Sequence, residues 1–241
     1  NEFLTLRQGS ADFAFASTIN WSVTVRELNL FNLPFLFPDH AAVDRVINGE
    51  TGRMIEKILQ HKGVTVLGWG ENGFRELTNS VRPITTPEDL KDVTVRVVGT
   101  PIFIDVMRLF GANPVNMGWQ EAKEAFQQGI VDAQENPVLS IIVPTELWQY
   151  HEYITFWHYV IDPLILAVSN DAWENFTPAD QKLLREAAVE ASAWQKQQVR
   201  DGLIAPNLSA HETLQEKGMQ LSVLTAEQIA AFKALTDTVY E

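Results

Sequence analysis

The 241 residues are 46% hydrophobic and 20% charged, a composition that can bury one large core or two modest ones and that excludes an intrinsically disordered chain. Asp and Glu number 31 against 18 Lys and Arg, and the resulting net charge of −13 argues against nucleic acid as a partner. With no cysteine, disulfides, thiolate metal sites and cysteine nucleophiles are excluded.

The first ten residues show no basic region followed by an apolar core, so no signal peptide is visible. No apolar run reaches the roughly 20 residues that a membrane-spanning helix needs. The opening segment "FLTLRQGSADFAFAS" reads as the end of a helix, a turn and a strand, with no element ahead of them. We therefore expect that the sequence begins inside a domain.

Hydrophobic periodicity predicts strands and helices in alternation along the chain. Strands are expected at 13–16, 64–68, 93–98, 130–133 and 164–169. Helices are expected at 40–61, 101–110, 119–128, 137–150 and from 178 to about 210. Thr177 is the expected N-cap of the last helix, with Pro178 in its first turn. The alternation is typical of an α/β protein with parallel strands.

Two segments, "LRQGSADFAFAS" and "FQQGIVDAQENP", share the order helix end, Gln, Gly, Asp, short strand and polar tip. In each, Gly9 or Gly129 suits the position just after a helix, where a left-handed backbone is cheap only for glycine. This repeat of one unit predicts two similar lobes. Because ligands of open α/β sheets bind beyond the carboxyl ends of strands, residues 17–21 and 135–136 become candidate cleft residues.

The strand "DVTVRVVGTP" places Arg96 among valines, on a sheet that is expected to be covered on both faces. A buried guanidinium is too costly unless an anion meets it. Two interpretations stay open at this point. Arg96 pairs internally with a carboxylate such as Glu135, or it forms a bidentate clamp on a ligand carboxylate, for which its planar fork is suited.

Further candidates lie in the neighbouring segments. Arg75 follows a Gly- and Asn-rich stretch and could reach a cleft, while Arg82 beside Pro83 looks like a surface residue. Trp119 begins a helix after a glycine and could line a pocket, although an aromatic residue there is more often part of the core. Tyr159 is open between the two roles, and His158 is expected to serve packing.

Enzyme signatures are missing from the sequence. The five histidines have no metal-ligand spacing, and no Walker loop, GxSxG elbow or GxGxxG after a strand is present. Carboxylates at Glu71, Glu121 and Glu135 are not marked as an acid and base pair. We expect no catalytic residue, no metal and no cofactor.

Three stretches together resemble the solute-binding proteins of tripartite ATP-independent periplasmic (TRAP) transporters: "NGFRELTNSVRPITTPEDLKDVTVRV", "GANPVNMGWQEAKEAFQQGIVDAQENP" and "AVSNDAWENFTPADQKLLREAA". The resemblance runs from about residue 6 to 205. It implies an α/β, two-lobed, periplasmic-binding-protein-like fold with a ligand cleft between the lobes and a long helix that spans both. It also implies that an N-terminal strand and helix precede the present segment and are missing from it.

The resemblance implies the following lobes. Lobe I is expected to comprise 1–72 and 162–200, and lobe II 73–161 and 201–241. Two departures from the family pattern are Ala133, where Gly is common, and Tyr159, where His is frequent.

The resemblance also assigns site residues. Arg96 corresponds to the arginine that makes a bidentate salt bridge to the substrate carboxylate, and Asn136 to the asparagine of the QENP motif. Arg75 and Trp119 match further family positions. The expected ligand-binding set is completed by three residues: Tyr159, Asn20 and Trp21. Within the same motif, Asp132 is expected to serve the turn, and Gln134 and Glu135 the strand end.

The function implied is a non-enzymatic, monomeric, periplasmic protein, secreted by way of a signal peptide in its precursor. It would capture a small organic acid, with sugar acids and C4-dicarboxylates ranked together, and deliver it to the membrane permease subunits of a TRAP transporter. Binding of an aromatic acid is an alternative, since Trp21, Trp69 and Trp119 all lie near the expected cleft. A sensory ligand-binding module and an α/β enzyme acting on a small acid are the others.

Overall fold

The computed structural model describes residues 2–205 and 208–240. They form two compact units, each assembled from several segments of the chain. Unit 1 contains the chain up to Phe31, then Phe37–Gly73 and Ile161–Asp201. Unit 2 contains Asn32–Leu36, Phe74–Val160 and the chain from Gly202 on. The sequence predicted that the chain passes from one lobe to the other after residues 72, 161 and 200. It did not predict that residues 32–36 belong to unit 2.

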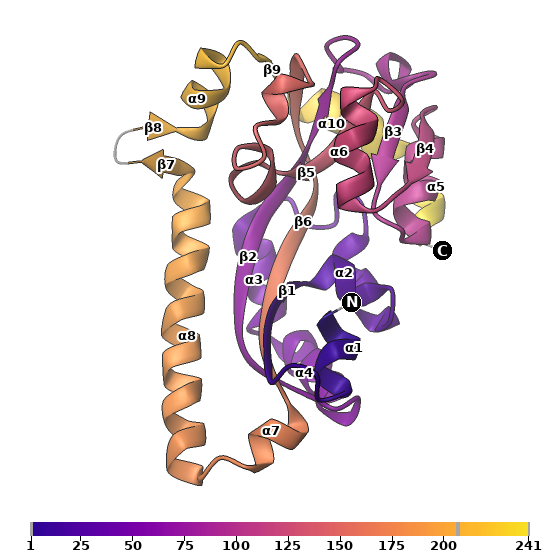
Figure 1. Cartoon of the computed structure of the whole chain (residues 1–241). Helices are drawn as coiled ribbons and strands as arrows, with labels where there is room; N and C mark the ends of the chain where they lie inside the picture. The colour runs from indigo at the N-terminus through magenta and orange to yellow at the C-terminus, as the bar shows by residue number, and fades with distance from the viewer. Residues whose placement is uncertain (1, 206–207, 241) are drawn as a thin grey trace. The chain divides into compact units, whose positions relative to one another are not determined.

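Unit 1 combines strands with helices (Figure 1). Its elements are α1 (Glu2–Arg7), β1 (Phe13–Ser17), α2 (Thr18–Ser22), most of a 3-10 helix (Arg26–Asn32), α3 (His40–Ile47), α4 (Glu50–His61), the first part of β2 (Val64–Asn79), the last part of β6 (Tyr153–Ser169), α7 (Asn170–Glu174) and α8 (Pro178–Asp201). β1 runs antiparallel to β6, with Phe13 opposite Val168 and Ser17 opposite Leu164.

The long helix α8 packs closely on β2 because two residues of that strand lack side chains. A Cβ atom at Gly68 would lie 2.6 Å from Ser192 Oγ, and one at Gly70 would lie 2.6 Å from Gln195 Oε1. The Gln195 amide also hydrogen-bonds both backbone groups of Glu71, at 3.0 and 2.8 Å. This side chain therefore satisfies the backbone of β2 as a neighbouring strand would.

Unit 2 contains the remaining parts of β2 and β6 with a parallel layer beside β2. Its other elements are a 3-10 helix (Pro87–Leu90), β3 (Thr94–Val97), α5 (Pro101–Leu109), β4 (Asn113–Asn116), α6 (Trp119–Gln127), β5 (Ala133–Pro137), a π-helical turn (Val138–Ile142), 3-10 helices (Leu147–Gln149 and Asp237–Tyr240), β7 (Leu203–Ala205), β8 (Leu208–Ser209), α9 (Ala210–Glu216), β9 (Gln220–Val223) and α10 (Ala226–Ala234).

Strand directions in unit 2 bring three carboxyl ends to one edge. β3 is parallel to both β4 and β5, with Arg96 opposite Val115 and Gln134. β9 is parallel to β6, whereas β2 is antiparallel to β5. The expectation of parallel strands is thus confirmed for β3, β4 and β5. It is wrong for the β1–β6 and β2–β5 pairs, which are antiparallel.

The two segments that share one sequence pattern, around Gly9 and Gly129, do end their helices in the same way. Gly9 and Gly129 have φ of 67° and 64°. The amide of each glycine bonds the carbonyl three residues back, and the next amide bonds the carbonyl five residues before itself. This is the Schellman pattern, which favours glycine because of its left-handed backbone. Asp132 then accepts a hydrogen bond from the amide of Thr94 at 2.8 Å, which confirms its structural role.

Several predicted boundaries were wrong, each for a local reason. The helix at 40–61 is two helices, broken at Gly49, which caps α4. The predicted helix at 137–150 is only a π-helical and a 3-10 turn, since Pro144 interrupts it. α8 ends at Asp201 before Gly202, whose φ is 66°, so it stops well short of residue 210. All of α8 belongs to unit 1.

Strand lengths were underestimated most. β2 and β6 are 16 and 17 residues long, and each continues from one unit into the other. The strand expected at 130–133 lies at Ala133–Pro137. The α/β fold with two units is confirmed, and the ligand cleft between lobes stays a prediction.

Candidate functional site

Arg96 lies near the end of β3 and is 6% exposed, flanked by the fully buried Val95 and Val97. Its Nε donates to the carbonyl of Met117 at 3.1 Å, so the guanidinium turns toward the carboxyl end of the neighbouring strand β4. Throughout residues 2–205 and 208–240, no carboxylate forms a salt bridge with it. A buried positive charge is thus left with one neutral hydrogen bond.

The electrostatic state of Arg96 reflects this isolation. The pKa of Arg96 is lowered from 12.5 to about 10, chiefly by burial and also by the nearby charge of Arg75, while the charge of Glu135 partly offsets both. Arg96 stays protonated at neutral pH, and the described side chains do not compensate the free energy cost of burying its charge. An anionic ligand of matching geometry would remove that cost, and a carboxylate fits the guanidinium fork in a bidentate manner.

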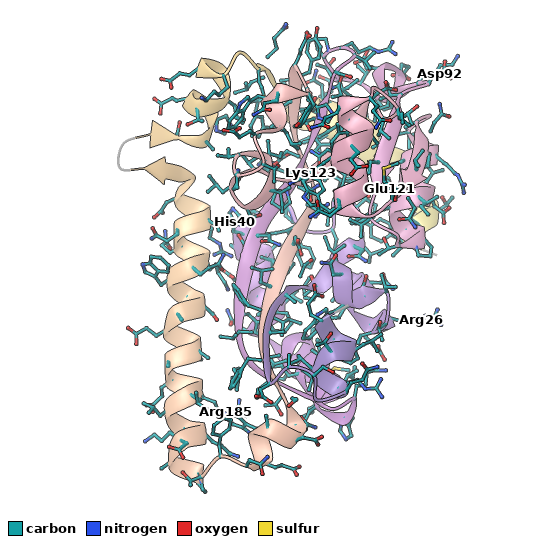
Figure 2. The ribbon with its side chains drawn as sticks, viewed as in Figure 1. Arg26, His40, Asp92, Glu121, Lys123 and Arg185 are labelled. Atoms are coloured by element: carbon teal, nitrogen blue, oxygen red, sulfur yellow. The ribbon has the colours of Figure 1, made fainter. Side chains whose placement is uncertain are left out.

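Trp119 supplies an aromatic wall beside Arg96. It is the first residue of α6, and its N-cap residue is Gly118. The centre of the Arg96 guanidinium lies 5.5 Å from the centre of the Trp119 ring. Lys123, which Figure 2 labels one turn further along α6, has its Nζ 5.8 Å from the same ring centre. The half-buried indole therefore contacts both cations and Phe126, at a ring distance of 6.4 Å.

Arg75 differs from Arg96 because it has an internal partner. Its Nε donates to Glu135, and its Nη2 donates to Glu135 Oε1 at 2.9 Å and to the Glu135 carbonyl at 2.7 Å. A fourth bond joins Nη2 to Asn136 Oδ1 at 3.0 Å. Of the two interpretations of Arg96, internal pairing with Glu135 is the one that the structure excludes, since Arg75 holds that carboxylate.

Asn136 extends this network further within unit 2. Its Nδ2 donates to Gln134, whose own Nε2 donates to Thr78 Oγ1 at 2.7 Å, and Thr78 lies 2.8 Å from His151 Nδ1. Burial lowers the pKa of His151 to about 4, so its ring is neutral at pH 7. Nδ1 of the neutral ring can either accept from the Thr78 hydroxyl or donate to it, depending on the tautomer.

Tyr159 is fully buried in an aromatic cluster of unit 2. Its ring contacts Trp157, Phe35 and Phe103 at centroid distances of 5.1, 5.8 and 5.8 Å. No hydrogen-bond partner for its hydroxyl exists among the described residues. Burial raises its pKa well above the usual range, and the charge of Glu135 adds to the effect, so it is a neutral phenol. A buried hydroxyl without a partner is unusual and marks a place where a polar group can be received.

The two predicted site residues of unit 1 lie on α2. Asn20 is exposed, whereas Trp21 is completely buried, with its ring edge-on to Phe3 at 5.3 Å. Ser17 caps this helix and donates to the buried carboxylate of Asp162 at 2.6 Å. Trp21 is thus a core residue of unit 1.

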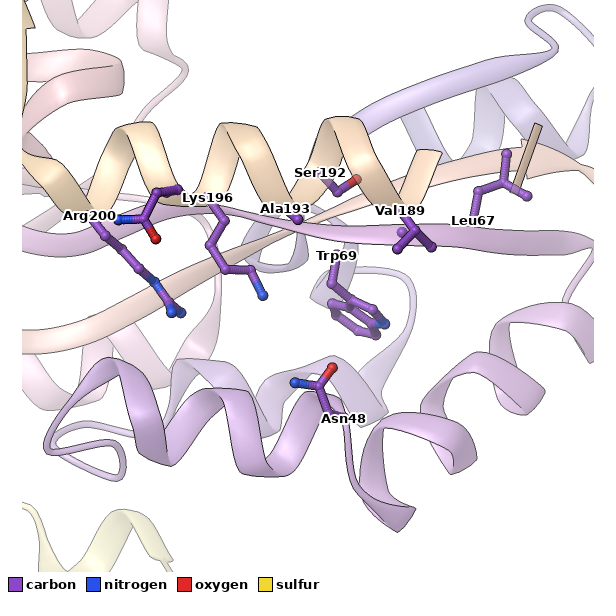
Figure 3. Close-up of a pocket in the computed structure, with 10 residues that line it drawn as sticks. Asn48, Leu67, Trp69, Val189, Ser192, Ala193, Lys196 and Arg200 are labelled. Carbon is purple, nitrogen blue, oxygen red and sulfur yellow. The ribbon is translucent and has the colours of Figure 1, made fainter. Parts of the chain in front are cut away.

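Unit 1 also carries a cavity of about 340 Å³ between α8, β2 and the junction of α3 and α4 (Figure 3). Trp69, Lys196 and Arg200 line it. Arg200 bonds Asp44 at 2.6 Å and Glu71 at 2.7 Å, and Lys196 bonds Asp44 at 3.2 Å. Because the cations here are matched by carboxylates, this cavity offers no unpaired charge to an anion.

The carboxylates of this cluster show how complete the pairing is. The hydrogen bond from Arg200 lowers the pKa of Asp44, despite its partial burial. Burial alone would raise the pKa of Glu71, but hydrogen bonds from His40 (Figure 2) and Arg200 outweigh it, and the pKa lies below the usual value.

The sequence reasoning missed two features of the site. Met117, whose carbonyl orients Arg96, carries no side-chain signal because the contact is through its backbone. Thr100, at the amino end of α5, is 1% exposed and has an unpartnered hydroxyl. A threonine before a proline at a predicted helix start indicates an N-cap, but it does not report that the hydroxyl makes no cap bond.

Within the described part of the chain, no three His, Cys, Asp or Glu side chains gather as metal ligands. Over the same residues, no helix has both the length and the apolar character needed to cross a bilayer.

The described residues thus form two α/β units, and Arg96 of unit 2 is buried without a carboxylate partner among them. Comparison with known proteins shows which family has this fold. The family model DctP, described as bacterial extracellular solute-binding protein, family 7, matches residues 1–241, and the chain belongs to this family. It is a family of substrate-binding proteins of transporters, which are not enzymes.

Two curated proteins are similar to this chain over about four fifths of its length. The chain is 30% identical over 196 residues to the 2,3-diketo-L-gulonate-binding periplasmic protein YiaO of Escherichia coli, covering 81% of this chain and 60% of YiaO. A second curated relative, from Haemophilus influenzae, is 32% identical and is covered over 58% of its length. The chain thus spans about 60% of the length of these relatives.

Solved structures match the fold closely. A TRAP periplasmic solute-binding protein of Ralstonia eutropha with bound (S)-2-acetolactate has a TM-score of 0.93 and 45% identity, over 99% of this chain and 76% of that protein. One from Polaromonas bound to D-erythronate has a TM-score of 0.90 and 31% identity, over 99% and 76%.

Proposed function

We propose that this protein captures a small organic acid in the periplasm and delivers it to the membrane permease subunits of a TRAP transporter. Membership of the solute-binding family supports the transport role, and the relatives described as periplasmic support the location. The observation that carries the ligand class is Arg96: a buried, protonated guanidinium that the described residues leave without a carboxylate.

The proposed contacts follow from the geometry around Arg96. Arg96 holds the ligand carboxylate, and Trp119 covers one side of it through the cation–π contact already present. Tyr159, with its unpartnered buried hydroxyl, and Asn136 are proposed to meet polar groups of the ligand.

The remaining three predicted residues carry less support. Arg75 is proposed to add positive potential at the site while remaining bonded to Glu135. On unit 1, Asn20 is proposed as a polar contact, and Trp21 as a support beneath α2 because its ring is buried.

A screen of organic acids by thermal shift tests the proposal, since a ligand that binds only the folded protein raises its melting temperature. Sugar acids, C4-dicarboxylates, short hydroxy acids and aromatic acids belong in the screen, together with uncharged alcohols of similar size. We expect hits only among carboxylates.

Calorimetry on the best hit then tests the residue. Arg96→Met should weaken binding by a factor of 100 or more, because a charge-assisted pair is lost and about 3 kcal/mol corresponds to roughly that ratio. Arg82→Met, at an exposed arginine of the same unit, is the matched control and should bind as the wild type does. Equal affinity of the two variants would rule out Arg96 as the carboxylate site.

A further inference from the structure

Thr100 occupies the N-cap position of α5 but does not cap the helix. Its side chain forms no cap hydrogen bond, although threonine at this position normally accepts one from the first turn. The residue is 1% exposed, and within the described chain its hydroxyl has no partner at all. Its own amide is already used, in a bond to the carbonyl of Val98 at 2.7 Å. No hydrogen bond therefore joins the Thr100 hydroxyl to the backbone amides in the first turn of this nine-residue helix.

This helix end lies at the same edge of the sheet as Arg96. Thr100 follows β3 after a two-residue turn, and Arg96 points toward the end of the adjacent strand β4 through its bond to Met117. The turns after the two strands touch: a Cβ atom at Gly99 would lie 2.8 Å from Nδ2 of Asn116, the last residue of β4.

The first turn of α5 also borders the other predicted contacts. Phe103, the third residue of the helix, lies with its ring 5.8 Å from the guanidinium centre of Arg75. The same ring lies 5.8 Å from that of Tyr159. The amino end of α5 is thus built into the neighbourhood of three proposed ligand-binding residues, Arg96, Arg75 and Tyr159.

We propose that Thr100 and the amino end of α5 bind an oxygen on the carbon next to the ligand carboxylate, so that the substrates are 2-hydroxy or 2-oxo acids. This inference rests on the proposed function. A hydroxyl can donate to a keto oxygen or accept from a ligand hydroxyl, and the amides of a helix start favour an oxygen with negative character. A site that leaves its own hydroxyl buried and unpaired rejects an acid without that oxygen.

Three of the relatives' ligands have this feature in common, whereas succinate, bound by a relative that is 26% identical, lacks it. 2-Acetolactate and D-erythronate carry a hydroxyl on C2, and 2,3-diketo-L-gulonate carries a keto group there. Those ligands otherwise differ in length and branching. A contact at C2 is therefore a discriminating feature that ligands of such different shape can share.

The test uses two stable acids that differ only at C2: 2,3-dihydroxy-3-methylbutanoate and 3-hydroxy-3-methylbutanoate. Calorimetry is run with the wild type, Thr100→Val, Thr100→Ser and Arg96→Met. The wild type should prefer the dihydroxy acid by about 10-fold or more, as expected for a hydrogen bond in a buried site. Thr100→Val should lose that preference by weakening the dihydroxy acid alone, and Thr100→Ser should keep it.

The variants also separate this inference from the proposed function. Arg96→Met should bind neither acid. If it binds both as the wild type does, the proposed function fails. If Arg96→Met fails to bind while Thr100→Val keeps the wild-type preference, only the role of Thr100 is overturned. A wild type that binds neither acid, or both equally, overturns the substrate class. Thr100→Val should melt at or slightly above the wild-type temperature without ligand, because the buried hydroxyl makes no cap bond that could be lost.

Discussion

Replacing Arg96 by methionine should make the ligand-free protein more stable. Arg96 is charged in both the folded and the unfolded state at pH 7, but burial lowers its pKa from 12.5 to about 10 in the folded state. At 1.36 kcal/mol per pH unit, this difference corresponds to about 3 kcal/mol of destabilisation that is fully present below pH 10. The side chain retains some exposure, so we expect a gain of about 1–3 kcal/mol from Arg96→Met.

Arg75 should respond in the opposite direction. It is 3% exposed and bonds the fully buried Glu135 through both carboxylate oxygens. Arg75→Met would leave that carboxylate buried without its partner, and breaking a buried pair on one side costs about 3–5 kcal/mol. Arg96→Met should therefore raise the free energy of unfolding, and Arg75→Met, in the same unit, should lower it.

Urea unfolding of the ligand-free protein at pH 7, followed by circular dichroism, measures both effects. Arg82→Met is the control, and as an exposed change it should stay within about 0.5 kcal/mol of the wild type. If Arg96→Met lowers the unfolding free energy as Arg75→Met does, then Arg96 has a structural partner and the reasoning about the open charge is wrong.

Three further changes test other parts of the structure. His151 is held neutral with a pKa of about 4, so the unfolded state takes up a proton below pH 6.5 that the folded state refuses. Stability should fall by up to about 3 kcal/mol between pH 6.5 and 4, and His151→Asn should reduce this loss in urea titrations at the two pH values. Gly129→Ala should cost about 1 kcal/mol because φ is 64°, with Gly129→Asn costing less; equal costs would contradict the backbone argument. Glu71→Gln should cost about 3 kcal/mol by breaking the buried pair with Arg200, whereas Glu186→Gln, in an exposed pair, should cost under about 0.5 kcal/mol; equal losses in thermal melts would refute the difference.

The parts of the fold that the sequence predicted are those with local causes. The turns at Gly9 and Gly129 follow from the conformational freedom of glycine, and both have the expected backbone. Thr177 caps α8 together with Asp180, as its position before Pro178 indicated. The short apolar strand around Arg96 was visible because apolar runs of that length have few alternatives.

The parts that were missed depend on distant partners. β2 and β6 extend through polar residues that look like loop, such as "GENG" in β2, because cross-strand bonds and the Gln195 amide satisfy their backbones. No periodicity reports such a contact, since Gln195 lies more than 100 positions away in sequence.

The site shows the same division. Burial of Arg96 followed from its valine neighbours, and Trp119 lies beside it as its helix-start position allowed. The partner of Glu135 could not be predicted, because Arg75 and Arg96 are both near it and only the geometry selects Arg75. The role of Thr100 depends on a hydrogen bond that is not made, and sequence alone cannot report a missing bond.

A crystal structure of the protein with the best ligand from the acid screen tests the central claim most directly. We predict that the ligand carboxylate places its two oxygens about 2.7–2.9 Å from the terminal nitrogens of Arg96, over the edge of Trp119. Arg75 should keep its bonds to Glu135 in that structure. A carboxylate bound by another cation, with Arg96 left as it is in the ligand-free protein, would contradict the account.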